Sequence, residues 1–227
     1  MEDEEEGARP CKVVLIGESG VGKTSIITRF TSNTFSSQLM STPGGNFVTK
    51  NMIIEDENQS IKFEIWDTAG QERYRSLIKV FYKDASACVL VYDITRKSSF
   101  DEIKNYWVKE IKEKAPEDTS KKYKIFILIF IYIVLALAGN KNDMYEFEEV
   151  NNNEGLALAK ELNAIYLRIS AKDQKGGIDE LFKSIGKQFL NPKSEITSNM
   201  TKEELKSKGE KLMRDKIKNN KKKKKCC

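Results

Sequence analysis

Residues 17–24 read Gly17-Glu18-Ser19-Gly20-Val21-Gly22-Lys23-Thr24 and directly follow the apolar run 13–16. The stretch matches G-x-x-x-x-G-K-[ST], a glycine-rich loop between a strand and a helix. Glycines let the backbone approach an anion, so that successive N–H groups converge on phosphate oxygens, while Lys23 supplies a charge and Thr24 a hydroxyl for Mg²⁺. A tight turn with a solvated lysine is the alternative. The nucleotide-contacting residues expected here are Ser19, Gly20, Val21, Gly22, Lys23 and Thr24.

Length and composition favour one compact domain with an appendage. The 227 residues can bury a sizeable core, and the absence of histidine excludes His-based triads and His-ligated metals. Cys11 and Cys88 lie on apolar, strand-like runs, and we expect them to be reduced core thiols. No apolar segment follows the acidic residues 1–6, so we expect no signal peptide.

The formal net charge of +5 is unevenly distributed. Residues 191–227 hold thirteen Lys and Arg against five Asp and Glu, a net of +8, which leaves about −3 on residues 1–190. A basic run such as 221–225 can bind nucleic acid, act as a nuclear signal or stay solvated. Its position directly before Cys226 and Cys227 favours a fourth interpretation, a membrane-surface patch beside two lipid-modified thiols.

The alternation of strand and helix patterns over residues 11–190 predicts an α/β fold, a doubly wound, six-stranded, mostly parallel sheet. Asp56-Glu57-Asn58 predicts a hairpin turn, which would make the second and third strands antiparallel. We expect residues 1–10 to be an acidic extension and 191–227 a flexible basic tail. Strands are expected at 12–16, 47–54, 61–66, 87–94, a segment ending at 138, and 165–169, and helices at 23–31, 76–82, 100–114, 154–162 and 178–190.

A second motif closes the third predicted strand, Trp66-Asp67-Thr68-Ala69-Gly70-Gln71-Glu72. Asp67 can hold Mg²⁺ through water, and the N–H of Gly70 can face a terminal phosphate. Gln71 is then placed to orient a water for in-line attack, which makes it the candidate catalytic residue. A lone D-x-x-G also occurs in ordinary turns, but the phosphate-binding loop upstream favours the nucleotide interpretation.

The stretch Asn140-Lys141-Asn142-Asp143 follows the fifth strand and indicates which base is bound. The carboxylate of Asp143 can accept hydrogen bonds from the N1–H and the exocyclic amine of guanine, whereas adenine offers neither donor there. Because an unpaired buried acceptor costs about 1–3 kcal/mol, adenine would be rejected. The alternative is a plain polar turn.

Two further features complete the predicted guanine pocket. Ser170-Ala171-Lys172 follows the sixth strand, where Ala171 would offer its N–H to the guanine oxygen and Lys172 would flank the ring. Phe35 could cap the base edge-on, although by itself it is more typical of a core aromatic.

Together these residues resemble a Ras-like small GTPase, in particular its Rab branch, over roughly residues 9–190. The resemblance implies a switch in which GTP and Mg²⁺ order two loops and hydrolysis to GDP releases them. It implies that Thr42 binds Mg²⁺ and the terminal phosphate, and that Ser25 faces the α-phosphate. The Rab-like markers are Lys62-Phe63-Glu64-Ile65-Trp66, Arg73-Tyr74-Arg75-Ser76-Leu77, Phe81-Tyr82-Lys83-Asp84-Ala85 and Leu90-Val91-Tyr92-Asp93-Ile94-Thr95.

The resemblance also implies partners and a location. The partners are an exchange factor, an activating protein, a dissociation inhibitor, a prenylation escort and effectors, with the protein a monomer that binds no nucleic acid. The ending Cys226-Cys227 resembles the double-geranylgeranyl ending of Rab proteins, which implies cycling between the cytosol and the cytoplasmic face of an endosomal or secretory membrane. The rival interpretations are a nucleotide-binding scaffold without hydrolysis and a nucleic-acid-binding NTPase.

The chain departs from the family pattern after Thr42. The family usually continues with isoleucine, glycine, an apolar residue, an acidic residue and phenylalanine, whereas this chain has Pro43-Gly44-Gly45-Asn46-Phe47. Pro43 should hold Thr42 extended, and Gly45 removes an apolar contact that effectors commonly use. Effector identity therefore cannot be carried over.

A larger departure is the segment 120–134, where the family allows barely a residue. The apolar run 125–138 is fourteen residues long, short of the ~20 that span a bilayer. A buried strand with an extension would expose several Ile and Phe side chains. We favour a translated intron: Ser120-Lys121 can be encoded with a 5′ splice signal and Ile133-Val134 with a terminal AG, and splicing restores Thr-Ile-Leu-Ala-Leu-Ala-Gly-Asn.

Overall fold

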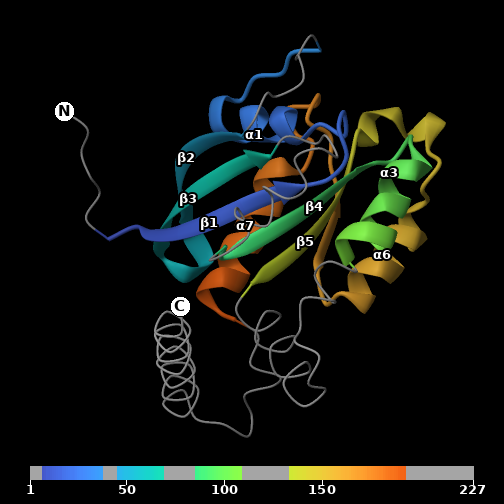
Figure 1. The fold of residues 1–227 in the computed structure, drawn as a ribbon. Coiled ribbons are helices and arrows are strands. Elements are labelled where there is room, and N and C mark those ends of the chain that lie inside the picture. Colours follow the sequence, from blue (N-terminus) through green and yellow to red (C-terminus); the bar gives the residue numbers. More distant parts are fainter. Residues whose placement is uncertain (1–6, 38–44, 69–84, 109–132, 193–227) are drawn as a thin grey trace, which may run out of the picture. The chain divides into compact units, whose positions relative to one another are not determined.

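The computed structural model describes residues 7–37, 45–68, 85–108 and 133–192. These residues form one mixed α/β unit around a six-stranded sheet (Figure 1). The elements are β1 (Arg9–Ile16), α1 (Lys23–Ser32), β2 (Gly45–Ile54), the 3₁₀ turn η1 (Glu55–Glu57), β3 (Gln59–Thr68), β4 (Ala87–Asp93), α3 (Lys97–Glu102), the π-helical turn η3 (Ile103–Trp107), β5 (Val134–Asn140), the 3₁₀ segment η4 (Asn142–Phe147), α6 (Asn152–Glu161), β6 (Ile165–Arg168) and α7 (Ile178–Leu190).

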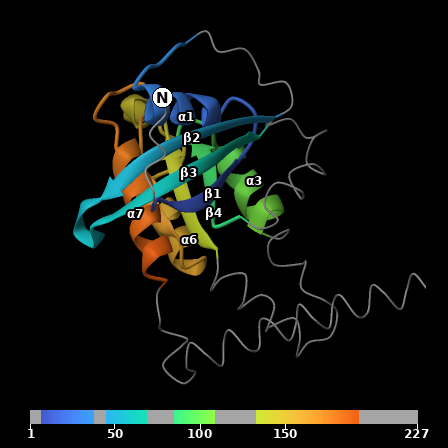
Figure 2. The same ribbon diagram turned by 90° about the vertical axis from the view of Figure 1, so that its left-hand side faces the viewer.

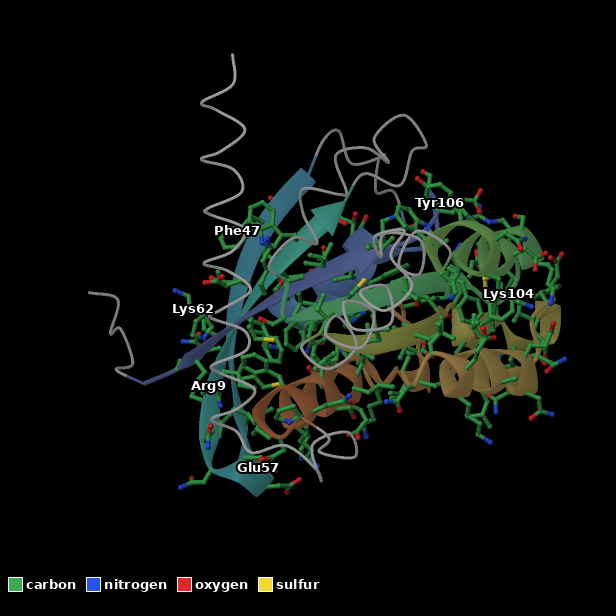
Figure 3. All side chains as sticks on the ribbon, turned by 60° about the horizontal axis from the view of Figure 1, so that its bottom comes forward. Arg9, Phe47, Glu57, Lys62, Lys104 and Tyr106 are labelled. Carbon is green, nitrogen blue, oxygen red and sulfur yellow. The ribbon has the colours of Figure 1, made fainter. Side chains whose placement is uncertain are left out.

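The strands lie in the order β2-β3-β1-β4-β5-β6, and only the β2–β3 pair of this sheet is antiparallel. This arrangement confirms the predicted fold class. The β2–β3 hairpin turns through η1 and Asn58, whose φ of 47° is one that Asn tolerates better than most residues. Figure 3 shows Glu57 at this turn and Phe47 toward the other end of the hairpin.

Helices cover both faces of the sheet because strand residues alternate between two apolar clusters. In β1, Val13 and Leu15 pack toward the cluster that contains residues of α1 and α7, and Val14 and Ile16 pack toward the cluster that contains residues of α3 and α6. Figure 2 shows α7 and α3 on opposite sides of the strands. Such double covering requires strands that are apolar on both faces, and β4 and β5 are buried along their whole length.

Several element boundaries differ from the sequence expectations. The strand expected at 12–16 begins earlier, at Arg9, because Arg9 and Pro10 pair with β3 although both are exposed. The helix expected at 100–114 begins at Lys97, where the hydroxyl of Ser99 accepts a hydrogen bond from the backbone N–H of Asp93 and fixes the turn before it. The helix expected at 76–82 lies outside the described residues, as does the end of the 100–114 helix.

Val134, which we assigned to the inserted segment, is the first residue of β5. Its backbone N–H donates to the carbonyl of Ser86, it pairs with Ala87, and its side chain is buried. The sheet therefore needs an apolar β-former at this position, a requirement that the isoleucine of the spliced sequence also meets. Residues 120–132 lie outside the described part of the chain.

The two internal cysteines confirm the sequence expectation. Cys11 and Cys88 are free and buried, one in each apolar cluster. In the part of the chain that the structure describes, no helix is long and apolar enough to cross a membrane.

Candidate nucleotide-binding site

The glycine-rich loop between β1 and α1 lies at the carboxyl end of the sheet, and two of its glycines adopt left-handed backbone. Gly20 has a φ of 78° and Gly22 a φ of 95°, which side-chain-bearing residues rarely adopt. A Cβ on Gly22 would lie 2.3 Å from Nδ2 of Asn140, and a Cβ on Gly17 would lie 2.2 Å from the carbonyl oxygen of Val91. Gly17 and Gly22 are therefore required, because the ends of β4 and β5 leave no room for a Cβ at these two positions.

Lys23 begins α1 and folds its side chain back over the loop. Its Nζ donates to the carbonyls of Gly17 at 2.8 Å and Glu18 at 2.9 Å. Burial lowers the pKa of Lys23 to about 8, and the nearby carboxylate of Asp67 opposes that shift. A buried ammonium that donates to neutral carbonyls is well placed to exchange them for an anionic oxygen.

Thr24 and Asp67 bring two oxygen ligands together from distant parts of the chain. The hydroxyl of Thr24, on α1, donates to Oδ2 of Asp67, near the end of β3, at 2.6 Å. Hydroxyl and carboxylate oxygens suit Mg²⁺, which takes one or two protein ligands and completes its shell with water and phosphate. Among the described residues no group of three or more Cys, Asp or Glu side chains could hold a metal alone. The donor set thus fits a magnesium ion held jointly with phosphate.

The base-recognition loop after β5 is tied to the phosphate-binding loop by one buried amide. Nδ2 of Asn140 donates to the carbonyl of Val21 at 2.8 Å, and its Oδ1 accepts from the N–H of Ala171 at 3.2 Å. The Asn140 side chain therefore connects its own loop to the phosphate-binding loop and to the loop of Ala171.

The carboxylate of Asp143 is held in place from the loop after β6. Its Oδ1 accepts a hydrogen bond from the hydroxyl of Ser170 at 2.6 Å, and Nζ of Lys172 lies 3.8 Å from Oδ2. Ser170 is fixed in turn, because its Oγ accepts from the N–H of Asp173. The two motifs, which lie 27 residues apart, are therefore in direct contact in the fold.

Lys141 occupies a strained backbone position and pairs with a carboxylate that sequence reasoning did not select. Its φ is 66°, and its Nζ lies 2.6 Å from Oδ2 of Asp93. Asp93, at the end of β4, is buried, and its other oxygen accepts from the N–H and the hydroxyl of Thr95. Lys141 therefore links the base loop to the turn after β4.

Arg29 is a second residue that the sequence did not indicate. It is 9% exposed, and its guanidinium donates to the carbonyls of Ala171 at 3.0 Å, Lys172 at 2.9 Å and Asn33 at 2.7 Å. It holds the Ser170-Ala171-Lys172 loop against the end of α1. No local pattern marks this role, since Ala171 lies 142 residues further along the chain.

The remaining predicted residues divide into two groups. Val21 is buried, Ser25 lies in the first turn of α1, and Phe35 is 39% exposed, so Phe35 is not the core aromatic that we held as its alternative. The residues that lie outside the described part of the chain are Thr42, Gly70, Gln71, Cys226 and Cys227.

Residues 12–191 match the model of the Ras family. The chain belongs to the Ras family. Similar proteins include ypt5 of Schizosaccharomyces pombe, a GTP-binding protein 42% identical over 179 residues, covering 78% of this chain and 77% of the relative. Human Ras-related protein Rab-31 is 41% identical over 181 residues, covering 80% and 84%, and human Rab-22A is 37% identical over 190 residues, covering 84% and 89%.

These relatives confirm the resemblance to the Rab branch. This Ras-family protein is a small GTPase that binds and hydrolyses GTP, and its relatives make it a Rab-like switch. The described residues keep the motifs of such a protein close together: Lys23 lies over the glycine-rich loop, and Asp143 accepts a hydrogen bond from Ser170.

Proposed function

We propose that this GTPase is a Rab-like guanine-nucleotide switch that recruits effectors in its GTP state and so regulates vesicle-mediated membrane traffic. The observation that carries the proposal is the bridge made by Asn140, which joins the phosphate-binding loop to the loop of Ala171. This buried side chain fixes the distance between the loops that we propose for the base and for the phosphates, which supports binding of a complete guanine nucleotide. GTP and GDP with Mg²⁺ are the ligands.

The phosphate half of the site would work through positioning and charge. The backbone N–H groups of the loop, with Ser19, Val21 and Ser25, bind phosphate oxygens, and Lys23 neutralises the outer ones. Mg²⁺ would be held by Thr24 and Thr42, with Asp67 acting through water, and would supply positive charge where negative charge develops. Gly70 offers its N–H to the terminal phosphate.

The catalytic step depends on Gln71 in this proposal. Its amide orients a water in line with the bond to the leaving phosphate, so the protein contributes orientation and not covalent chemistry. At the other end of the nucleotide, Asp143 accepts two hydrogen bonds from guanine, Lys141 and Lys172 flank the ring, and Phe35 caps it.

A Gln71→Leu variant tests the switch. We expect it to bind GTP as the parent chain does and to slow hydrolysis by about tenfold or more, because the attacking water is no longer oriented. Phosphate release after a single turnover measures the rate. Unchanged turnover would remove Gln71 from the mechanism. Proteins retained by the GTP-loaded variant and not by the GDP-loaded parent chain would be its effectors.

We infer the remaining partners from the similarity to Rab proteins. An exchange factor, an activating protein, a dissociation inhibitor and a prenylation escort would act on a monomer. Two geranylgeranyl groups on Cys226 and Cys227, beside the lysines 221–225, would hold it on the cytoplasmic face of an endosomal or secretory membrane. Imaging of the tagged protein identifies the compartment, and a uniform nuclear location would contradict a role in traffic.

A further inference from the structure

Arg96 extends from the turn after β4 back to the phosphate-binding loop, 77 residues earlier in the chain. Its Nη2 donates to the carbonyl oxygen of Ser19 at 2.8 Å and lies 3.4 Å from Oε2 of Glu18. In Figure 1 the β1–α1 loop and the β4–α3 turn lie at the same end of the sheet. One guanidinium therefore contacts two consecutive residues of the loop.

The guanidinium also lies close to the left-handed part of the loop. A Cβ built on Gly20 would be 3.7 Å from Nη1 of Arg96. The Nε of Arg96 is buried and has no hydrogen-bond partner among the described residues. Desolvating that N–H costs free energy, so the pose is kept by the other contacts of the guanidinium.

The backbone of Arg96 is fixed by a hydrogen-bonded turn. Its N–H donates to the carbonyl of Asp93 at 3.1 Å, and its own carbonyl accepts from the hydroxyl of Ser99 at 2.7 Å. Asp93 is the carboxylate that pairs with Lys141 of the base loop. The same short turn thus contacts both halves of the nucleotide site, through Asp93 on one side and Arg96 on the other.

We propose that Arg96 is a positioning residue that holds the phosphate-binding loop in its binding conformation and thereby slows nucleotide release. For the phosphates to leave, the loop around Ser19 and Gly20 has to move. Any such movement breaks the charge-assisted hydrogen bond to Ser19 and the ion pair with Glu18. Arg96 takes no part in the hydrolysis step itself, since it contacts the loop and not the reacting atoms.

The exposure of the pair limits the size of the effect. The Arg96 and Glu18 side chains are 38% and 35% exposed, so solvent and salt screen their attraction. Burial is the main cause of the lowered pKa of Lys23, and the positive charge of Arg96 acts in the same direction. We therefore expect a several-fold effect on the release rate, well below that of a residue that binds phosphate directly.

The release rate of N-methylanthraniloyl-GDP from the full chain, chased with excess GDP in the presence of Mg²⁺, tests the proposal. We expect Arg96→Met to release the nucleotide about 3- to 10-fold faster, the range for one charge-assisted hydrogen bond that is partly exposed. Arg96→Lys, which keeps the charge and one donor, should restore part of the difference. Raising the salt concentration should accelerate release from the parent chain more than from Arg96→Met.

Lys97→Met is the matched control, since it removes the same charge one residue away. Nζ of Lys97 pairs with Glu154 of α6, and no contact of Lys97 with the phosphate-binding loop is seen among the described residues. Release within twofold of the parent rate is expected for this control. An Arg96→Met rate within twofold of the parent, or equal acceleration by Lys97→Met, overturns the proposal. If Arg96→Met does not fold, Arg96→Gln is measured under the same criteria.

Discussion

At the residue scale, buried arginine and lysine side chains join loops that are distant in sequence. Arg29 is the clearest case, because it holds the carbonyls of Ala171 and Lys172 against α1. Arg29→Met would leave the buried carbonyl of Ala171 and the part-buried carbonyl of Lys172 without this donor, so we expect the free energy of unfolding to fall by about 2–4 kcal/mol. Urea denaturation of the GDP-loaded protein measures it. The control Lys160→Met, at an exposed position near the end of α6, should change stability by less than about 0.5 kcal/mol.

The two buried thiols, Cys11 and Cys88, should make the free energy of unfolding depend on pH in the alkaline range. Burial raises the pKa of Cys11 and of Cys88 from 9.0 to about 12, with the carboxylate of Glu64 adding to the shift at Cys11. Between pH 9 and 12 the folded protein binds more protons than the unfolded chain, so the stability present below pH 9 is lost as the pH rises. In urea titrations from pH 8 to 11, the Cys11→Ala, Cys88→Ala double variant should lose stability less steeply. Equal slopes would show that the thiols do not contribute.

Sequence reasoning selected residues that local spacing marks. Lys23, Thr24, Asp67 and Asp143 each belong to a short motif at a strand end, and in the structure Lys23 contacts the glycine-rich loop, Thr24 contacts Asp67 and Asp143 contacts Ser170. Arg29, Asp93 and Arg96 were missed, since each acts through a partner many residues away. From the sequence alone, an arginine on a helix or a turn is expected to be solvent-exposed. Only the tertiary structure shows the carbonyl to which it donates.

At the element scale, the apolar strand runs predicted the sheet well because a doubly covered parallel sheet buries both faces of its strands. The errors lie at polar ends and in short turns. The 3₁₀ segment η4 (Asn142–Phe147) was not among the predicted elements, because six residues are too few to show a helical apolar pattern. The capping box of α6, in which Asn151 and Glu154 exchange hydrogen bonds, starts that helix two residues before the apolar pattern does.

The fifth strand gives a test of the proposed intron. A chain in which isoleucine alone replaces residues 120–134 would start β5 with that isoleucine, in the buried place of Val134 beside Ala87. Since the change adds one methylene to a buried site, we expect stability equal to or up to about 0.8 kcal/mol above that of the full chain, with unchanged GDP affinity. Thermal unfolding of both chains measures this. A short chain that fails to fold, or transcripts that uniformly retain the segment, would contradict the intron.

At the scale of the whole molecule, charge divides the chain into two parts. Residues 1–190 carry about −3 and include the nucleotide site, whereas residues 191–227 carry +8 and end in two cysteines. A mildly acidic domain gains no electrostatic attraction from an anionic membrane surface, so the proposed membrane attachment relies on the tail. The basic charge alone is weak and salt-sensitive, and one lipid chain gives only reversible binding.

Two variants distinguish these contributions. Replacing Cys226 and Cys227 by serine should move the protein from the membrane to the soluble fraction of cells, because five lysines contribute only about 1 kcal/mol each at an anionic leaflet. Replacing lysines 221–225 by glutamine, with both cysteines kept, should leave the protein on membranes but weaken the salt dependence of its binding to anionic vesicles. Cell fractionation and vesicle sedimentation at two salt concentrations measure these effects. Persistent membrane association of the serine variant would mean that protein contacts, and not lipid chains, hold the GTPase there.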